Sequence, residues 1–345
     1  MIITATASRL SSNVSVLKKM ILAGCDILRF NLSYGTVAEK IETIKTAQKT
    51  INELNSQTKI LIDLPNSKIR LGGFPKKELL VKEGDRLILK SGDYSENPEE
   101  FISIQHPDIG NILYPEQQIV IDEGEIALKI ISIHSKDTIE CLVLNEGAIY
   151  PYKGLNWVGQ QADHLQTIEK IKAEIIPQLV GLAPDIIACP YTNNEIIAQH
   201  YKEIIDNFNW PEKPKMAVKI ETPAGVENIE LISEYADIII LERGNLGIAG
   251  DFAKVGVYQN HIINYCKKIR KPIFISTQIL ESVINGFLPQ RSEISDLTNL
   301  VLMGVNGIVL CHETGVSMRP VYSIATAKKI ISEAEKYKHT LSNLL

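Results

Sequence analysis

Short apolar runs alternate along most of the chain with longer stretches in which apolar residues recur at helical spacing. Within Val321–Tyr337, for example, Ile324, Ala327, Ile331 and Ala334 follow one another at intervals that place them on one helix face. Eight apolar runs are predicted as strands: Ile2–Thr6, Asp26–Asn31, Lys59–Asp63, Asp185–Pro190, Met216–Glu221, Asp237–Arg243, Pro272–Thr277 and Gly307–Glu313. The helices predicted after them include Val14–Ala23, Val37–Leu54, Ala162–Leu179, Ala224–Tyr235 and Val321–Tyr337.

This alternation of strand and helix predicts an α/β fold with a parallel sheet whose strands are buried on both faces. Eight strand–helix units are the number that closes a (β/α)8 TIM barrel, so this barrel is the favoured architecture. A doubly wound open sheet is the alternative that the pattern leaves open.

One segment departs from the alternation. Between about Gly73 and Asn156 the pattern is all-β, and the runs Val81–Leu89 and Ile119–Leu128 alternate apolar and polar residues around glycine-containing turns. We therefore predict a barrel domain over 1–72 and 157–345, and a small all-β domain over 73–156 inserted after strand three. Such an insert is expected to act as a lid over the carboxyl-end face of a barrel.

Composition sets limits on the class of protein. The chain has 345 residues, 45% of them hydrophobic, and a formal net charge of -5, which argues against a general binder of nucleic acid or of membrane surfaces. No apolar run approaches the ~20 residues of a membrane span. The five cysteines are scattered without a CxxC pair, which favours buried free thiols in a reducing compartment. Because Met1 leads directly into a predicted strand, we expect no signal peptide and a cytoplasmic location.

Polar side chains gather where the predicted strands end, which is where barrels of this kind carry their chemistry. These residues are Arg29, Asn31, Ser33, Asp63, Arg70, Lys219, Glu221, Gly244, Asn245, Thr277, Gln278 and Glu313. Cations close to carboxylates and hydroxyls suit a divalent metal ion and a phosphorylated or enolic substrate. Taken alone, Lys219 and Glu221 are better explained as a simple ion pair at a strand end, and it is the surrounding motifs that favour a functional role.

Several motifs resemble the pyruvate kinase family in order and spacing. Gly24–Gly35 (GCDILRFNLSYG) is similar to that family's GxxxARxNFSHG, and Lys219–Glu221 matches its Lys-Ile-Glu. Arg243–Gly247 (RGNLG) resembles RGDLG, Lys271–Ser282 resembles KPVIxATQMLES, and Pro289–Asn299 resembles PTRAEASDVAN. The similarity runs from the first strand to the last helix. The chain ends where the family's C-terminal regulatory domain would start, so that domain is expected to be missing.

The resemblance implies a phosphotransferase that moves the phosphoryl group of phosphoenolpyruvate to ADP, giving pyruvate and ATP, with Mg2+ or Mn2+. It implies that Lys219 stabilises the transferring phosphoryl group and the enolate, and that Glu221 and Asn245 hold the metal. Catalytic roles fall to Lys219, Arg29, Arg70 and Thr277; substrate binding to Gly244, Asn245, Thr277 and Lys219; and nucleotide binding to Arg29, Arg70, Lys153 and Asp122.

The chain also departs from the family. Asn245 stands where the family has a second metal-binding Asp, and Glu242 stands where it usually has Ala. An amide oxygen can ligate a hard cation but carries no charge, so metal affinity should be lower. Glu242 could compensate in part for the missing charge, but we do not expect it to, since its side chain is expected to point away from the site. The loop Thr6–Arg9, Tyr34 and the pair Cys311–His312 also differ from the family, which leaves the phosphoryl acceptor open.

A further departure concerns the monovalent cation. The resemblance implies a K+ region formed by Asn31, Ser33 and Asp63, and the family normally has Glu at the position of Lys68. A lysine there places a tethered cation where the monovalent ion would act, as in a K+-independent subgroup of the family. We therefore expect activity without K+.

Two other functions stay open. Metal-dependent enolate chemistry on a 2-oxo acid, of decarboxylase or aldolase type and without nucleotide, would use the same Lys219 and Glu221. A catalytically degenerate barrel that binds a metabolite or a partner protein would explain Asn245. The family resemblance also implies a possible homo-oligomer, for which a dimer is our expectation.

Overall fold

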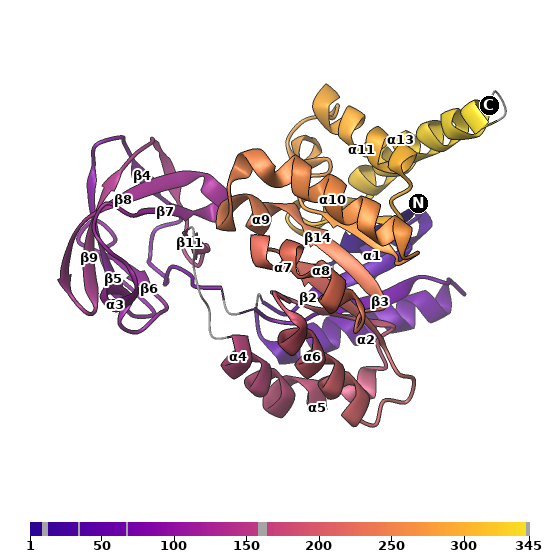
Figure 1. Cartoon of the computed structure of the whole chain (residues 1–345), viewed down its shortest axis with the longest axis horizontal. Coiled ribbons are helices and arrows are strands. Elements are labelled where there is room, and N and C mark those ends of the chain that lie inside the picture. Colours follow the sequence, from indigo (N-terminus) through magenta and orange to yellow (C-terminus); the bar gives the residue numbers. More distant parts are fainter. Residues whose placement is uncertain (9–12, 34, 67, 158–163, 343–345) are drawn as a thin grey trace. The chain divides into compact units, whose positions relative to one another are not determined.

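The computed structural model describes residues 1–8, 13–33, 35–66, 68–157 and 164–342. The chain forms two compact units (Figure 1). The first comprises Met1–Asn66, His164–Leu246 and Ala253–Leu345, and the second comprises Ser67–Asp163 together with Gly247–Phe252.

Eight parallel strands of the first unit close into a barrel in the order β1-β16-β15-β14-β13-β12-β3-β2. This confirms the (β/α)8 prediction over the open sheet. The strands are β1 (Ile2–Thr6), β2 (Ile27–Asn31), β3 (Lys59–Asp63), β12 (Ile186–Cys189), β13 (Lys215–Ile220), β14 (Ile238–Glu242), β15 (Ile273–Ser276) and β16 (Gly307–Leu310).

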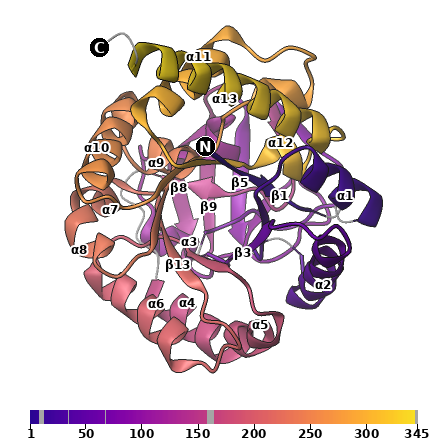
Figure 2. The same cartoon turned by 90° about the vertical axis from the view of Figure 1, so that its right-hand side faces the viewer.

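Helices surround these strands (Figure 2). They are α1 (Val14–Leu22), α2 (Val37–Glu53), α4 (His164–Lys170), α5 (Ile176–Leu179), α6 (Glu195–Asn207), α7 (Pro223–Glu227), α8 (Ile229–Ser233), α9 (Arg243–Ala249), α10 (Val255–Lys268), α11 (Arg291–Met303), α12 (His312–Gly315) and α13 (Pro320–Ser342). The apolar faces of the helices and the outward side chains of the strands form one large core, as the 3.6-residue period predicts.

Local sequence sets where several helices begin. Thr36 caps α2 in a capping box, in which its hydroxyl accepts the Glu39 N–H and the Glu39 carboxylate accepts the Thr36 N–H. Asn13 and Asn194 cap α1 and α6 with their side-chain oxygens. Each of these side chains satisfies a backbone donor that the first helical turn leaves without an intrahelical partner.

Two predicted helices are interrupted. The stretch predicted as Ala162–Leu179 contains a π-helical turn, Ile171–Ile175, before α5. Pro177 lies at the start of α5 and cannot donate a backbone hydrogen bond, which favours a change of helix type just before it. The stretch predicted as Ala224–Tyr235 divides into α7 and α8 at Asn228, whose φ of -97° and ψ of 14° are not helical.

The barrel interior is layered because alternate residues of each strand point inward. An apolar layer fills its middle: Ile27, Leu61, Ile186, Ala188, Ala217, Ile238, Ile240, Phe274 and Val309. Gly307 is required in this layer, since a Cβ there would lie 2.9 Å from the Phe274 ring. Two residues further along five of these strands, at the carboxyl end, the positions are polar: Arg29, Asp63, Lys219, Glu242 and Ser276. The candidate site therefore lies where the apolar layer gives way to polar side chains.

The second unit has its own core and consists mainly of strands, which confirms an all-β insertion after β3. Its six-stranded sheet has the order β11-β7-β8-β9-β5-β6, and β10 pairs with β4. The elements are β4 (Leu79–Val81), β5 (Arg86–Ser91), β6 (Ile102–Ile104), α3 (Ile109–Ile112), β7 (Gln118–Ile121), β8 (Ile126–Ser135), β9 (Thr138–Val143), β10 (Gly147–Ile149) and β11 (Leu155–Asn156). The predicted insert 73–156 lies inside this unit, and its borders stay a prediction.

The five cysteines are all free, and only Cys311 is partly exposed. Burial raises the pKa of Cys25 and of Cys266 to about 12, so neither is a thiolate at neutral pH. Within the described ranges, no helix combines the length and the hydropathy needed to cross a membrane.

Candidate active site

The carboxyl ends of the barrel strands bring charged and polar side chains together inside the barrel. Strand pairing places Thr6 beside Arg29 and Glu242 beside Ser276, so each pair points in the same direction. Lys219, two residues after the inward-facing Ala217, joins the same layer. These side chains are all buried, and their charges therefore act over short distances with little screening.

Arg29, on β2, is held by side chains of β1 and β3. Its Nε and Nη2 donate to Asp63 Oδ2 at 2.9 and 2.5 Å, and its Nη1 donates to Thr6 Oγ1 at 2.8 Å. Burial alone would lower the pKa of Arg29, but the Asp63 carboxylate outweighs burial and raises that pKa above its usual value. Asp63 Oδ1 is buried and has no hydrogen-bond partner among the described residues.

Lys219 lies between two carboxylates. Its Nζ is 3.1 Å from Glu221 Oε1 and 3.4 Å from Asp63 Oδ2. Burial would lower the pKa of Lys219, but the charges of Asp63, Glu221 and Glu242 together raise it above its ordinary value. The lysine is therefore a permanent cation in a site that excludes most water, which is where a charge stabilises a reacting anion most effectively.

Glu221 and Asn245 meet at the edge of this cluster. Asn245 Nδ2 donates to Glu221 Oε2 at 2.6 Å, so one carboxylate and one amide head are in contact. Burial raises the pKa of Glu221, and Lys219 opposes that shift. Oxygen ligands of these two types, completed by substrate oxygens, suit Mg2+ or Mn2+. Turning the Asn245 amide exchanges its nitrogen and oxygen, so that the oxygen can face a metal ion. The two residues therefore fit a divalent cation, with one negative charge fewer than two carboxylates would give.

Glu242 points into the barrel, which corrects the expectation that its side chain would turn away from the site. Its Oε1 accepts hydrogen bonds from Ser276 Oγ at 2.7 Å and from Thr277 Oγ1 at 2.6 Å. Burial would raise the pKa of Glu242, but Lys219, Arg29 and the two hydroxyl donors lower it to about 2. The carboxylate is ionised at neutral pH and can only accept hydrogen bonds.

Thr277 follows β15 in an unusual backbone conformation. Its φ is 75° and that of Gln278 is 54°, both in the left-handed region that β-branched residues rarely adopt. Glu313 holds the residues that follow, because its Oε1 accepts the N–H groups of Ile279 and Leu280 at 2.9 and 3.0 Å. The same carboxylate accepts the Cys311 N–H at 2.7 Å, which ends β16 at Leu310 instead of the predicted Glu313.

The other predicted site residues of the first unit lie at or just after the ends of the same strands. Gly244 and Asn245 occupy the first turn of α9, whose early N–H groups lack intrahelical acceptors. Asn31 pairs in register with Asp63, and its Oδ1 accepts the Ser33 N–H at 2.8 Å. His312 Nδ1 lies 2.8 Å from Glu281 Oε1. Two positions that differ from the family, Arg9 and Tyr34, lie outside the described residues.

The predicted nucleotide residues of the second unit also come together. Lys153 Nζ lies 2.9 and 2.8 Å from the two Asp122 oxygens, and Arg70 Nη1 donates to the Tyr152 carbonyl at 3.3 Å. Arg70 forms a β-bridge with Gly154, and Lys68 covers that glycine so closely that a Cβ there would lie 2.2 Å from Lys68 Cε. Lys153 thus pairs with Asp122, while Arg70 and Lys68 lie against the adjacent backbone of Tyr152 and Gly154. Such a group of cations suits phosphate groups.

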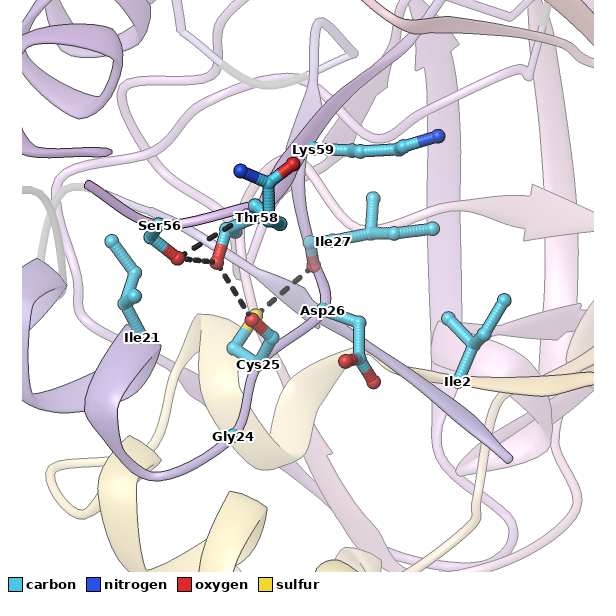
Figure 3. Close-up of a pocket in the computed structure, with 10 residues that line it drawn as sticks. Ile2, Ile21, Gly24, Cys25, Asp26, Ile27, Ser56, Thr58 and Lys59 are labelled. Carbon is cyan, nitrogen blue, oxygen red and sulfur yellow. Dashed lines mark hydrogen bonds between the residues drawn. The ribbon is translucent and has the colours of Figure 1, made fainter. Parts of the chain in front are cut away.

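A pocket lies at the opposite, amino-terminal end of the barrel strands (Figure 3). Its volume is about 340 Å³, and Ile2, Ile27 and Lys59, which begin β1, β2 and β3, contribute to its lining. The nearby polar groups bond to one another, as Thr58 Oγ1 does to the Cys25 carbonyl at 3.0 Å. In barrels of this type the amino-terminal face serves stability, so this pocket is not the candidate active site.

Three neighbours of the predicted site residues were misjudged from the sequence. Thr6 was considered only as part of a variant loop, Ser276 was hidden within an apolar strand run, and Glu242 was expected to point the wrong way. The sequence offered one signal for Ser276, which directly precedes the predicted strand-end residue Thr277. No set of three or more His, Cys, Asp or Glu side chains in the described part of the chain is arranged to hold a metal ion. A metal here would depend on Glu221, Asn245 and the substrate.

Comparison with known proteins gives one consistent result. A family model described as "Pyruvate kinase, barrel domain" matches residues 1–324. A pyruvate kinase from Thermococcus litoralis is 28% identical over 339 residues, which is 98% of this chain and 70% of that protein. A pyruvate kinase from Staphylococcus aureus strain MRSA252 is 28% identical over 347 residues. This chain spans 58% of the Staphylococcus protein.

Proposed function

The chain belongs to the pyruvate kinase family, and from that premise we propose that it transfers the phosphoryl group of phosphoenolpyruvate to ADP, forming pyruvate and ATP. One observation carries the proposal: a buried, permanently charged Lys219 lies between Asp63 and Glu221 at the carboxyl end of a closed barrel. Phosphoryl transfer requires positioning and charge stabilisation rather than covalent chemistry from the protein.

Lys219 and Arg29 supply the positive charge for this reaction. As the phosphoryl group leaves, negative charge develops on its oxygens and on the enolate oxygen of the product. Lys219 is held by two carboxylates and needs no reorganisation to stabilise that charge. Arg29 is oriented by Asp63 and Thr6 and is assigned to the phosphate of the substrate. A divalent cation held by Glu221 and Asn245 would supply further charge neutralisation when bound.

The carboxylate and the methylene carbon of the substrate are assigned to neighbouring loops. Backbone N–H groups of Gly244 and Asn245, in the first turn of α9, are assigned to the carboxylate. Thr277 is assigned to the proton transfer that converts the enolate to pyruvate. Arg70, Lys153 and Asp122 of the second unit are assigned to the nucleotide, on the basis of their shared cluster.

The assay that tests the function is direct. With phosphoenolpyruvate, ADP and Mn2+, the purified protein should form pyruvate and ATP in equal amounts. Pyruvate formation that does not require ADP, or the absence of pyruvate, would contradict the proposal. Family members normally use a divalent metal, so a chelator is expected to stop the reaction and added Mn2+ or Mg2+ to restore it.

We further expect K+ to be unnecessary. Lys68 provides a tethered cation in the second unit, next to the cluster of Arg70 and Lys153. Exchanging K+ for tetramethylammonium at constant ionic strength should change kcat by less than about twofold, a barrier change of roughly 0.4 kcal/mol. A strict requirement of the wild type for K+ would show that Lys68 does not replace the ion. If the charge of Lys68 does replace it, the variant Lys68→Gln should have a rate that depends on K+.

Asn245→Asp is expected to strengthen metal binding. The change places a second carboxylate beside Glu221, whose Oε2 lies 2.6 Å from the Asn245 amide nitrogen in the wild type. We expect Mn2+ affinity to rise about tenfold or more, since an added charge at such range is worth more than the ~1.4 kcal/mol that tenfold requires. Titration of free Mn2+ by electron paramagnetic resonance measures this without substrate.

Asn260→Asp, on the exposed side of α10, is the matched control because it adds the same charge away from the site. Equal Mn2+ affinities for wild type and Asn245→Asp would show that Asn245 is not part of the metal site. If Asn245→Asp bound Mn2+ more tightly but turned over more slowly, the neutral amide would be part of a different site design, in which catalysis requires one negative charge fewer.

One observation favours a second function. Three carboxylates, those of Asp63, Glu221 and Glu242, offset the two cations Arg29 and Lys219, which weakens the pull on a highly charged phosphate ester. Enolate chemistry on a 2-oxo acid without nucleotide would suit such a balance. Exchange of the C3 protons of pyruvate with deuterated solvent, in the absence of any ADP-dependent turnover, would select this function. Ligand binding with neither reaction would select a binding protein.

Location and assembly complete the proposal. We propose a cytoplasmic protein, in keeping with a glycolytic reaction and buried free thiols. We also propose a homo-oligomer, supported by the exposed side chains of Phe287, Leu288 and Met318, whose exposed fractions are 71%, 74% and 82%. Exposed apolar side chains that gather on one surface are typical of subunit contacts.

A further inference from the structure

Glu242 is a buried carboxylate that the proposed reaction does not use. It ends β14, and its side chain follows the inward-facing Ile238 and Ile240 on the same strand. Both of its hydrogen-bonding neighbours, Ser276 and Thr277, come from the next strand and its loop. A buried carboxylate is costly unless it is paired, so its location next to Thr277 requires a reason.

Thr277 is held at both its side chain and its backbone by two consecutive residues. Glu242 Oε1 accepts the hydroxyl at 2.6 Å. Arg243 donates from Nε and Nη2 to the Thr277 carbonyl at 3.1 and 2.9 Å, and from Nη2 to the Gln278 carbonyl at 2.8 Å. Arg243 is itself fixed by Asp296, whose Oδ2 lies 2.6 Å from Nη1.

This restraint works against the intrinsic preferences of Thr277. A β-branched residue with a φ of 75° is an outlier, and such conformations persist only where the surroundings over-determine them. The hydroxyl of threonine can also rotate to several partners. The bond to Glu242 removes that freedom, because an ionised carboxylate accepts but cannot donate. The hydroxyl hydrogen therefore points to Glu242, and the lone pairs of Oγ1 point elsewhere.

We propose that Glu242 is a positioning residue for proton transfer at C3 of the three-carbon product, acting by fixing the Thr277 hydroxyl so that Oγ1 serves as a hydrogen-bond acceptor in the site. The inference rests on the proposed function, and specifically on the assignment of Thr277 to the proton step. A water molecule held by the Thr277 oxygen donates a proton to C3, and the hydroxide that remains takes a proton from solvent. Glu242 itself touches neither substrate nor carrier.

The role predicts a selective defect. In Glu242→Ala, exchange of the C3 protons of pyruvate with deuterated solvent, followed by NMR, should slow by about 10²-fold, as expected when a reacting group loses its orientation. The KM for phosphoenolpyruvate should stay within about threefold, since substrate contacts are kept. Glu242→Gln keeps an oxygen acceptor of the same shape and should restore most of the exchange rate.

Ser276→Ala is the matched control because it removes the other hydroxyl on Glu242 Oε1 and leaves the Thr277 bond in place. Its exchange rate should remain within about threefold of wild type. A double-mutant cycle completes the test. Once Thr277→Val has removed the hydroxyl, adding Glu242→Ala should cause no further loss, whereas a structural role would lower the rate again.

A second measurement does not depend on activity. In protein labelled at threonine methyl groups, three-bond couplings of the Thr277 methyl carbon should report one χ1 rotamer in wild type and Ser276→Ala, and averaged rotamers in Glu242→Ala. If the protein neither exchanges pyruvate protons nor forms pyruvate, the proposed function fails, and these couplings still decide whether Glu242 positions Thr277. Averaged couplings in wild type, or unchanged couplings in Glu242→Ala, would overturn the inference.

Discussion

Replacing Lys219 by Met should reduce kcat for ADP-dependent pyruvate formation by about 10³-fold or more, the loss typical of removing a preorganised charge from a phosphoryl-transfer or oxyanion site. Methionine keeps the length and apolar stem of the side chain but removes the charge that lies 3.1 Å from Glu221 and 3.4 Å from Asp63. A coupled assay of pyruvate measures the effect.

Lys59→Met provides the matched control. Lys59 is an exposed lysine that begins β3, at the opposite end of the barrel strands, and its loss should leave kcat unchanged. Thermal unfolding of both variants will separate loss of chemistry from loss of fold. A Lys219→Met enzyme within tenfold of wild type would mean that the phosphoryl group is stabilised elsewhere.

Asp63→Asn should give the largest loss of stability. Asp63 Oδ2 accepts two bonds from Arg29 and lies near Lys219, and the side chain is almost fully buried. The neutral amide leaves two buried cations without their shared counter-charge. Removing one partner of a buried pair typically lowers the free energy of unfolding by about 3–5 kcal/mol. Urea unfolding, with an unchanged dependence on denaturant, measures the difference.

The control for this variant is Glu53→Gln, which removes the carboxylate of an exposed pair with Lys18. Exposed pairs contribute little, so its unfolding midpoint should not move. If Asp63→Asn were as stable as Glu53→Gln, then Arg29 and Lys219 would have to be neutralised by Glu221 and Glu242 alone.

The sequence was a good guide to the fold because apolar runs and amphipathic stretches follow two different periods. Every barrel strand begins within one residue of its prediction, and the change to strict alternation after Gly73 located the all-β insertion. Interruptions within helices were harder to predict. Pro177 was visible, but whether it ends a helix or shifts it to a π turn depends on how the flanking residues pack.

The site was predictable where a motif carries the chemistry, as for Lys219 and Glu221. The direction of Glu242 was not, because strands of a parallel barrel are buried on both faces. In the run Asp237–Arg243, Glu242 shares a face with Ile238 and Ile240. Because that face and the face of Ile239 and Leu241 are equally apolar, hydropathy does not reveal which of the two points into the barrel. The left-handed backbone of Thr277 was also hidden, since its residue type argues against it.

The two successive left-handed residues, Thr277 and Gln278, have a consequence for how this protein could change over time. Glycine at either position would relax the loop, and similar strained positions in other proteins are where stabilising substitutions are easily found. Glycine in place of Thr277 would also remove the hydroxyl that Glu242 now holds, and glycine at either position would loosen the backbone whose carbonyls Arg243 binds. Selection for a more stable protein and selection for a faster one would therefore pull this loop in opposite directions.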